Sequence, residues 1–133
     1  MAPKVAHIGI AVENLKEAAV MMESLLGIKP HTTEEVADQK VTASVFPVDG
    51  ARLELLSATA EDSPIAKFIA KRGPGIHHIC IEVDDLPSEL TRLKNAGFRL
   101  IDQAPRRGAQ GRMIAFIHPS STAGILVELQ QKS

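Results

Sequence analysis

An internal repeat is the feature that most limits what this chain can fold into. Residues 7–15 read HIGIAVENL, and residues 78–86 read HICIEVDDL. In both stretches a histidine opens an alternating apolar run that ends in polar residues and a leucine. Many α+β proteins contain similar strand and helix units, but here the polar residues recur at equivalent places as well. The repeat therefore indicates a tandem duplication.

The first copy predicts a strand, a helix and a hairpin. Residues 5–12 alternate with the period of two that a strand requires. Asn14 with Glu17 three positions later is a typical N-terminal helix cap, and Gly27 can end the helix in a left-handed conformation. Residues 41–57 contain two strand-like runs around Asp49-Gly50, which is typical of a tight hairpin.

The second copy repeats this order. A strand over residues 78–83 precedes a helix that Asp85 can cap and that Gly97 can end. Residues 112–130 then supply two strand-like runs around a turn rich in Pro, Ser and Gly. A linker helix over residues 63–73 separates the halves. We expect one α+β domain over residues 1–133, with half-repeats at about 5–58 and 76–131.

Composition narrows the class of protein without identifying it. The chain has 133 residues and a net charge of -1, which fits one globular domain and gives no general attraction to nucleic acid or anionic membranes. No apolar run is long enough to span a membrane, and the start lacks a signal-peptide pattern. The only cysteine, Cys80, cannot form an internal disulfide, so we expect a cytoplasmic protein.

Each half offers one histidine on its first strand and one glutamate on its last. Strand alternation places these side chains opposite the main aliphatic stripe: His7, Glu54, His78 and Glu128. A lone histidine or glutamate on a strand is usually structural or solvated, but a repeated set is harder to explain that way. Two imidazoles and two carboxylates suit a divalent metal with positions left for substrate oxygens. His77 must point to the other face, where we expect it to pack.

The same stretches carry a resemblance to a known family. The chain resembles the vicinal oxygen chelate superfamily, and within it the methylmalonyl-CoA epimerase family, over the segments HIGIAV, RLELL, DSPIAKFIAKRGPGIHHICIEVDD, RRGAQG and IAFIHPSSTAGILVELQ. This resemblance implies two βαβββ units that form a cupped mixed sheet around a metal site. It also implies that His7, Glu54, His78 and Glu128 bind the metal, with cobalt(II) or manganese(II) as the expected ions.

The resemblance further implies a reaction and its residues. The substrate would be methylmalonyl-CoA, and the α-proton would leave through an enolate that the metal stabilises. Glu128 is the first candidate base, and Asp38 or a water relayed through Gln39 is the second. Relatives typically read Glu-Gln/His-Gly-Val where this chain has Asp38 to Val41, and Lys where it has Ser120.

A basic loop and the open sheet edges lead to expectations about coenzyme A contacts and oligomeric state. Arg106, Arg107 and Gly108, together with Ser120, are the residues expected to contact coenzyme A, because cations beside flexible backbone suit phosphate groups. An ordinary solvated basic loop would look the same. A homodimer is expected because relatives often associate and because open sheet edges need cover.

Three other functions fit parts of the same pattern. A glyoxalase I-like lyase would use the same kind of metal site on a glutathione hemithioacetal, and a non-catalytic small-molecule-binding relative would need no matched ligand set. An extradiol dioxygenase would use two histidines and one glutamate on iron, which leaves the second glutamate unexplained. The segments specific to the epimerase branch favour the epimerase.

Overall fold

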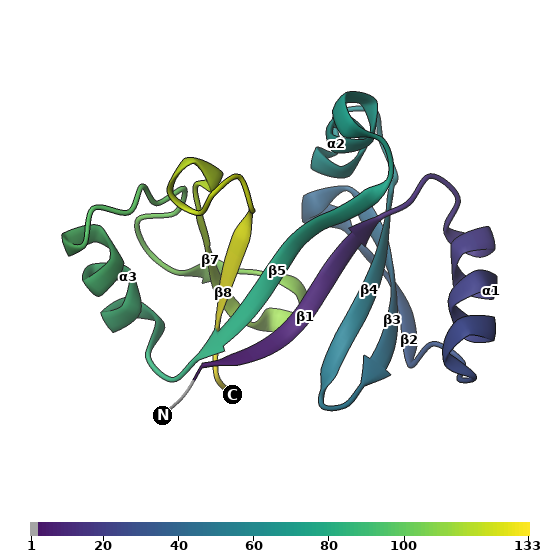
Figure 1. The fold of residues 1–133 in the computed structure, drawn as a ribbon, viewed down its shortest axis with the longest axis horizontal. Helices are drawn as coiled ribbons and strands as arrows, with labels where there is room; N and C mark the ends of the chain where they lie inside the picture. The colour runs from purple at the N-terminus through teal and green to yellow at the C-terminus, as the bar shows by residue number, and fades with distance from the viewer. Residues whose placement is uncertain (1–2) are drawn as a thin grey trace. The chain divides into compact units, whose positions relative to one another are not determined.

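The computed structural model describes residues 3–133 of the chain (Figure 1). The chain falls into two compact units, which are described separately. The N-terminal unit comprises residues 7–77, and the C-terminal unit comprises residues 78–133 together with residues 3–6. Among the described residues no helix is both long enough and apolar enough to cross a membrane.

The N-terminal unit has a mixed sheet with the strand order β2-β3-β4-β1. Strand β1 runs parallel to β4, whereas β3 is antiparallel to both β2 and β4. The elements are β1 (Lys4–Ala11), α1 (Leu15–Leu26), β2 (Thr32–Val36), the short helix η1 (Ala37–Gln39), β3 (Val41–Val48), β4 (Ala51–Ala58) and α2 (Pro64–Arg72).

The C-terminal unit repeats this topology. Its sheet has the order β6-β7-β8-β5, with β5 parallel to β8 and with β7 antiparallel to β6 and β8. The elements are β5 (Gly75–Val83), α3 (Leu86–Asn95), β6 (Arg106–Arg107), η2 (Ala109–Gly111), β7 (Met113–Ile117), η3 (Pro119–Ser121) and β8 (Val127–Gln131). The predicted α+β class with two tandem βαβββ units is confirmed.

The predicted helix caps are present. The Asn14 side chain accepts a hydrogen bond from the Glu17 backbone N–H at 3.0 Å, and Asp85 accepts one from Ser88 at 3.1 Å. Ser63 caps α2 in the same way, with Pro64 at the first helical position. These short polar side chains satisfy backbone donors that have no partner within the helix.

Asp49 and Gly50 form the predicted tight turn between β3 and β4. Both have positive φ, 49° and 80°, as a two-residue type I′ turn requires. The turn fixes the register of the hairpin, in which Val45 lies opposite Glu54. The position of Glu54 on its sheet face is therefore set by a local signal in the sequence.

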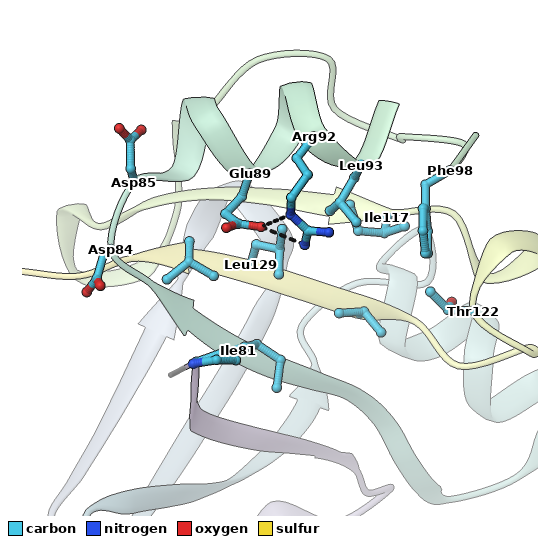
Figure 2. A pocket seen from close by; sticks show the side chains of 13 residues that line it. Ile81, Asp84, Asp85, Glu89, Arg92, Leu93, Phe98, Ile117, Thr122 and Leu129 are labelled. Atoms are coloured by element: carbon cyan, nitrogen blue, oxygen red, sulfur yellow. Dashed lines mark hydrogen bonds and ion pairs between the residues drawn. The ribbon is translucent and has the colours of Figure 1, made fainter. Parts of the chain in front are cut away.

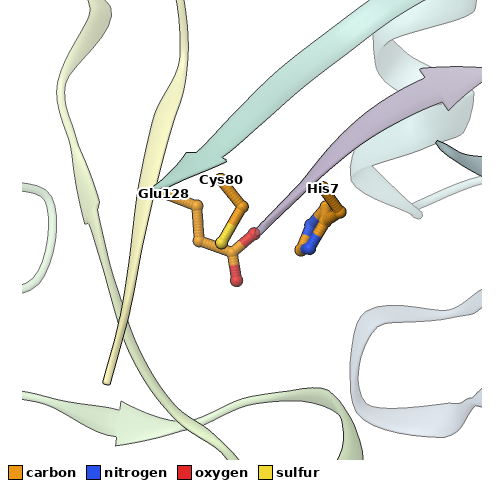
Figure 3. Close-up of side chains that lie close together, drawn as sticks. All are labelled: His7, Cys80 and Glu128. Carbon is orange, nitrogen blue, oxygen red and sulfur yellow. The ribbon is translucent and has the colours of Figure 1, made fainter. Parts of the chain in front are cut away.

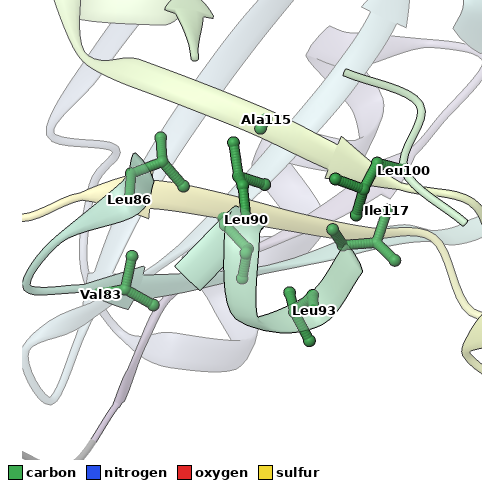
Figure 4. Packing of buried hydrophobic residues seen from close by; sticks show 8 residues of the cluster. Val83, Leu86, Leu90, Leu93, Leu100, Ala115 and Ile117 are labelled. Carbon is green, nitrogen blue, oxygen red and sulfur yellow. The ribbon is translucent and has the colours of Figure 1, made fainter. Parts of the chain in front are cut away.

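Helices cover the aliphatic faces of the sheets. In the C-terminal unit, α3 buries Leu86, Leu90 and Leu93 against residues of β5, β7 and β8 (Figure 4). In the N-terminal unit, α1 contributes Met22 to a cluster with Phe46 and Leu55. These contacts bury the aliphatic stripe of each half, because apolar side chains gain most when they leave water.

Two strands carry no apolar pattern that would predict them. Strand β2 has the sequence TTEEV and is mostly exposed, and β6 consists of Arg106 and Arg107 in a region expected to be a flexible loop. Both strands are at the end of the strand order in their unit and pair with one neighbour there. Such a strand is hydrogen-bonded to a neighbour along one edge and exposed to solvent. It therefore does not need the alternating apolar and polar residues that identify inner strands.

Candidate functional site

His7 and Glu54 lie next to each other in the N-terminal unit. Gly9 on β1 is the register partner of Glu54 on β4, so the histidine two residues earlier is on the same face. His7 Nδ1 lies 3.4 Å from Glu54 Oε2. His7 is buried, and the Glu54 side chain is 15% exposed. A carboxylate this deeply placed needs a partner, and the imidazole is one.

His78 and Glu128 form the corresponding pair in the C-terminal unit. Cys80 on β5 is the register partner of Glu128 on β8, and Figure 3 shows both side chains leaving neighbouring strands. His78 Nε2 lies 3.1 Å from Glu128 Oε1, and both residues are buried. The Phe116 ring meets the His78 ring edge to face, with centroids 6.1 Å apart. This packing restricts the orientation of the imidazole.

The two pairs occupy equivalent places in their units. In each, the glutamate pairs in register with the residue two positions after the histidine. The repeat seen in the sequence is thus also a repeat of side-chain neighbours, with a buried imidazole beside a carboxylate in both halves. His7 faces its glutamate with Nδ1, whereas His78 faces its glutamate with Nε2.

The donor types and spacings fit a divalent metal. Imidazole nitrogen and carboxylate oxygen are ordinary ligands of first-row divalent ions. Two such atoms, each about 2.1 Å from one cation, lie about 3.0 Å apart at a right angle. The distance of 3.1 Å between the nitrogen and oxygen of the C-terminal pair agrees with two ligands of one cation, and it also agrees with a hydrogen bond. The corresponding distance in the N-terminal pair, 3.4 Å, is close to the same value.

Arg52 is a cation directly beside the N-terminal pair. Its Nε lies 3.2 Å from Glu54 Oε2, and its Nη2 lies 3.2 Å from His7 Nδ1. Alternation along β4 puts Arg52 and Glu54 on one face, but alternation alone gives no reason to assign the arginine a role. The contact with His7 depends on the register between β1 and β4, in which His7 is the partner of Arg52.

Asp38 and Gln39, the candidates for the second proton carrier, lie on η1 between β2 and β3. Asp38 is exposed and Gln39 is half-buried. The next residue, Lys40, has a positive φ of 55° and forms an ion pair with Asp62. Its ammonium group lowers the pKa of the Asp62 carboxyl below the usual value.

The residues expected to contact coenzyme A lie in the C-terminal unit. Arg106 pairs with Asp102, with Nε 3.0 Å from Oδ1, and its guanidinium stands 5.4 Å from the Phe116 ring centroid. The Phe116 ring contacts both the Arg106 guanidinium and the His78 ring. Arg107 is exposed.

Gly108 and Ser120 are the other two residues expected to contact coenzyme A. Gly108 is partly buried against Ile114. Ser120 is exposed on η3, and its backbone N–H donates to His118 Nδ1 at 3.0 Å.

Gln130 is a buried polar residue to which the sequence assigns no role. It follows Glu128 on the same face of β8, and its side-chain Nε2 has no hydrogen-bond partner among the described residues. Its Oε1 accepts a weak contact from the Cys80 thiol at 3.9 Å. The period of two along β8 places Gln130 on the Glu128 face, but its burial is a property of the folded unit.

A cavity of about 470 Å³ lies in the C-terminal unit beside α3 (Figure 2). Ile81 of β5 and Leu129 of β8 line it, and both point to the face opposite Cys80 and Glu128. Glu89 and Arg92 form an ion pair at its edge. The cavity therefore lies on the face of the C-terminal unit opposite the one that carries Glu128.

Comparison with known proteins shows similarity over most of the chain. Residues 6–116 match the family model of the Glyoxalase/Bleomycin resistance protein/Dioxygenase superfamily. The uncharacterized protein YqjC of Bacillus subtilis is 42% identical to this chain, and the match covers 92% of this chain and 88% of YqjC. The ethylmalonyl-CoA/methylmalonyl-CoA epimerase of Cereibacter sphaeroides is 38% identical over 98% of this chain and 99% of its own length.

A solved structure gives the same picture. The crystal structure of methylmalonyl-CoA epimerase from Mycobacterium tuberculosis matches with a TM-score of 0.90 at 36% identity. The match covers 97% of this chain and 87% of that chain. The topology described above is thus similar to that of a protein named as an epimerase.

Proposed function

The chain belongs to the glyoxalase/bleomycin resistance protein/dioxygenase superfamily, and we propose that it is a methylmalonyl-CoA epimerase. It interconverts (2R)- and (2S)-methylmalonyl-CoA by removing and returning the α-proton. Support comes from the similar proteins named as epimerases, which match nearly the whole chain.

One observation supports the assignment of metal binding to particular residues. Each unit holds a buried histidine beside a glutamate at the same place in the same topology. We infer that His7 and Glu54 bind one divalent metal together with His78 and Glu128, and cobalt(II) or manganese(II) is the proposed ion. A divalent ion held by these residues would supply Lewis-acid stabilisation of the negative charge that develops on an enolate.

Residues of the chain remove the α-proton and return it. The carboxylate of Glu128 takes the α-proton of the substrate, which breaks the C–H bond and leaves the electron pair in the enolate. The opposite face of the α-carbon then receives a proton, and the configuration inverts. Asp38, or a water relayed through Gln39, is the proposed source of that second proton. Burial of Glu128 keeps bulk water away from its carboxylate.

Binding of the coenzyme A part is assigned to the C-terminal unit. Arg106 and Arg107 supply positive charge for phosphate groups, and Gly108 and Ser120 supply backbone and hydroxyl contacts. Arg106 stands on Phe116, which holds its guanidinium in a defined place. We further propose a cytoplasmic homodimer, on the single cysteine and on the need to cover open sheet edges.

A glyoxalase I-like lyase acting on a glutathione hemithioacetal is the alternative that shares this metal chemistry. A non-catalytic small-molecule-binding relative is the other. Neither is favoured, because the similar proteins of known activity are named as epimerases of coenzyme A thioesters.

Proton exchange in heavy water tests the proposal. Purified protein is incubated with a single isomer of methylmalonyl-CoA, with and without cobalt(II), while NMR follows the α-proton and chiral analysis follows the configuration. We expect metal-dependent exchange accompanied by inversion. Absence of exchange in the metal-loaded protein would reject the epimerase, and glutathione hemithioacetals would then be the next substrates to test.

A further inference from the structure

Arg52 competes for the atom with which His7 would hold a metal. Its Nη2 lies 3.2 Å from His7 Nδ1, a contact in which the guanidinium donates and the ring nitrogen accepts. A neutral imidazole has one nitrogen lone pair available, because its other nitrogen carries the proton. The lone pair of His7 can therefore serve Arg52 or a metal, but not both at once.

Both ring nitrogens lead to the same exclusion. A metal on Nδ1 would take the place of the arginine donor directly. A metal on Nε2 would require the proton on Nδ1, which would then face Glu54 Oε2 at 3.4 Å and could no longer accept from Arg52. In either arrangement the N–H of Arg52 that now points at His7 needs a new acceptor.

Charge gives a second reason to expect competition. The guanidinium lies 3.2 Å from Glu54 Oε2, so it neutralises a carboxylate that the proposed metal also needs. A cation this close repels a dication, and partial burial weakens the screening by water. With a metal, Glu54 and Arg52 all charged, this part of the N-terminal unit would keep a net positive charge that favours an anionic ligand.

Arg52 also has the means to bind such a ligand. Its side chain is 25% exposed, and its hydrogen bonds use Nε and Nη2. No hydrogen bond to its Nη1 is found among residues 3–133. The planar fork of a guanidinium matches the two oxygens of a carboxylate.

We propose that Arg52 is the residue that receives the anionic group of the substrate, and that it leaves His7 when the metal binds. This inference rests on the proposed function for the identity of the substrate, whose free carboxylate is the group to be received. Arg52 thus opposes binding of the metal and promotes binding of the substrate to the metal-loaded protein.

The opposed effects separate this role from a structural one. If Arg52 merely braced Glu54, its removal would loosen the ligand pair and weaken metal binding. If Arg52 competes with the metal and receives the anion, its removal strengthens metal binding and weakens substrate binding. A loss of packing cannot produce both changes together.

The experiment compares Arg52→Met, which keeps the length of the side chain without its charge, with Arg52→Lys, which keeps the charge without the fork. Arg92→Met is the matched control, since Arg92 pairs with Glu89 on α3 in the other unit. Cobalt(II) is titrated into each metal-free protein by calorimetry. Methylmalonyl-CoA is then titrated into each cobalt-loaded protein, and the visible cobalt absorption reports binding without requiring turnover. Arg52→Gln carries the same test if the methionine variant does not fold.

For Arg52→Met we expect a Kd for cobalt(II) about tenfold lower and a Kd for methylmalonyl-CoA about tenfold higher than in the unmodified protein. For Arg52→Lys, both Kd values should lie between those of Arg52→Met and those of the unmodified protein. Arg92→Met should have the same two Kd values as the unmodified protein. Weaker cobalt(II) binding by Arg52→Met, or an unchanged affinity for methylmalonyl-CoA, would overturn the inference. If the protein binds the thioester in this way but does not epimerise it, the proposed function fails while the role of Arg52 stands.

Discussion

Glu128 is the single residue on which the proposed chemistry depends most, because it is both a proposed ligand and the proposed base. Glu128→Gln keeps the size of the side chain and removes its charge and its ability to take a proton. Loss of general-base catalysis typically costs about 10²–10⁴-fold in rate. We expect a fall of that order in α-proton exchange, measured by NMR in heavy water at saturating cobalt(II).

The control for this variant is Glu89→Gln. Glu89 carries the same functional group, lies in the same unit and pairs with Arg92 on α3, away from the Glu128 face. It should exchange the α-proton at the rate of the unmodified protein. Exchange that survives in Glu128→Gln would show that another group removes the proton.

Gly108 has a packing role that is separable from its proposed contact with coenzyme A. A Cβ placed on Gly108 would lie 2.7 Å from Ile114 Cδ1 and 2.9 Å from its Cγ1. Ile114 is buried, so the side chain has little room to give way. Gly108→Ala should therefore lower the free energy of unfolding by about 1–3 kcal/mol, as overpacking does.

Urea unfolding measures this change, and Ile114→Val provides the internal check. The valine lacks the Cδ1 atom that the new methyl group would meet first. Gly108→Ala should cost less in the Ile114→Val background than in the unmodified protein. Equal costs in both backgrounds would contradict the packing explanation.

The four proposed ligands follow from the sequence, whereas the environment of one pair does not. A strand period of two and an internal repeat are enough to select His7, Glu54, His78 and Glu128. The contact between Arg52 and His7 joins β1 to β4, two strands that are far apart in the chain. Side-chain reach across such a pairing cannot be derived from the pattern of either strand alone.

At the scale of elements, the parts with local signals are the parts that the sequence predicts. Caps and apolar stripes mark α1, α2 and α3, and a turn with two positive φ angles marks the hairpin of β3 and β4. Strand β2 lacks such a signal, because its stability comes from pairing with β3 rather than from burial of its own side chains.

Lys40 joins η1 to β3 in a conformation that suits glycine. Its φ of 55° is in the left-handed region, which costs a residue with a Cβ about 1 kcal/mol or more relative to glycine. Replacing Lys40 also removes its ion pair with Asp62, so a single variant would mix two effects. The comparison of Lys40→Gly with Lys40→Ala removes the ion pair from both.

We expect Lys40→Gly to unfold at a higher urea concentration than Lys40→Ala, with a difference in unfolding free energy of about 1 kcal/mol. The difference isolates the backbone strain, since both variants lose the ammonium group. An alanine variant as stable as the glycine variant would mean that the turn relaxes when Lys40 is replaced.

At the scale of the whole molecule, the proposed metal site would give the duplication a chemical role, because each unit would supply half of the ligand set. A histidine and a glutamate from one unit leave a divalent ion with few protein ligands, and one carboxylate only half neutralises it. Two such pairs on one ion give two imidazoles, two carboxylates and free positions for substrate oxygens. A shared site of this kind would need both copies of the repeat.

Metal stoichiometry tests this idea, because separate sites and a shared site give different results. A shared site predicts one cobalt(II) per chain, whereas independent pairs predict two. His7→Ala and His78→Ala should each weaken binding of that one ion by more than about a hundredfold, since even partners outside the ligand set are worth 10–100-fold. Equilibrium dialysis with elemental analysis gives both the number of ions and the affinity.

His118→Ala serves as the control, because His118 caps η3 and belongs to neither pair. It should bind cobalt(II) as the unmodified protein does. If His7→Ala instead kept one tightly bound ion and lost another, each unit would bind its own metal. The substrate would then meet two separate ions, and the enolate mechanism would have to be assigned to one unit alone. A single ion lost in both variants would tie the chemistry to the duplication itself.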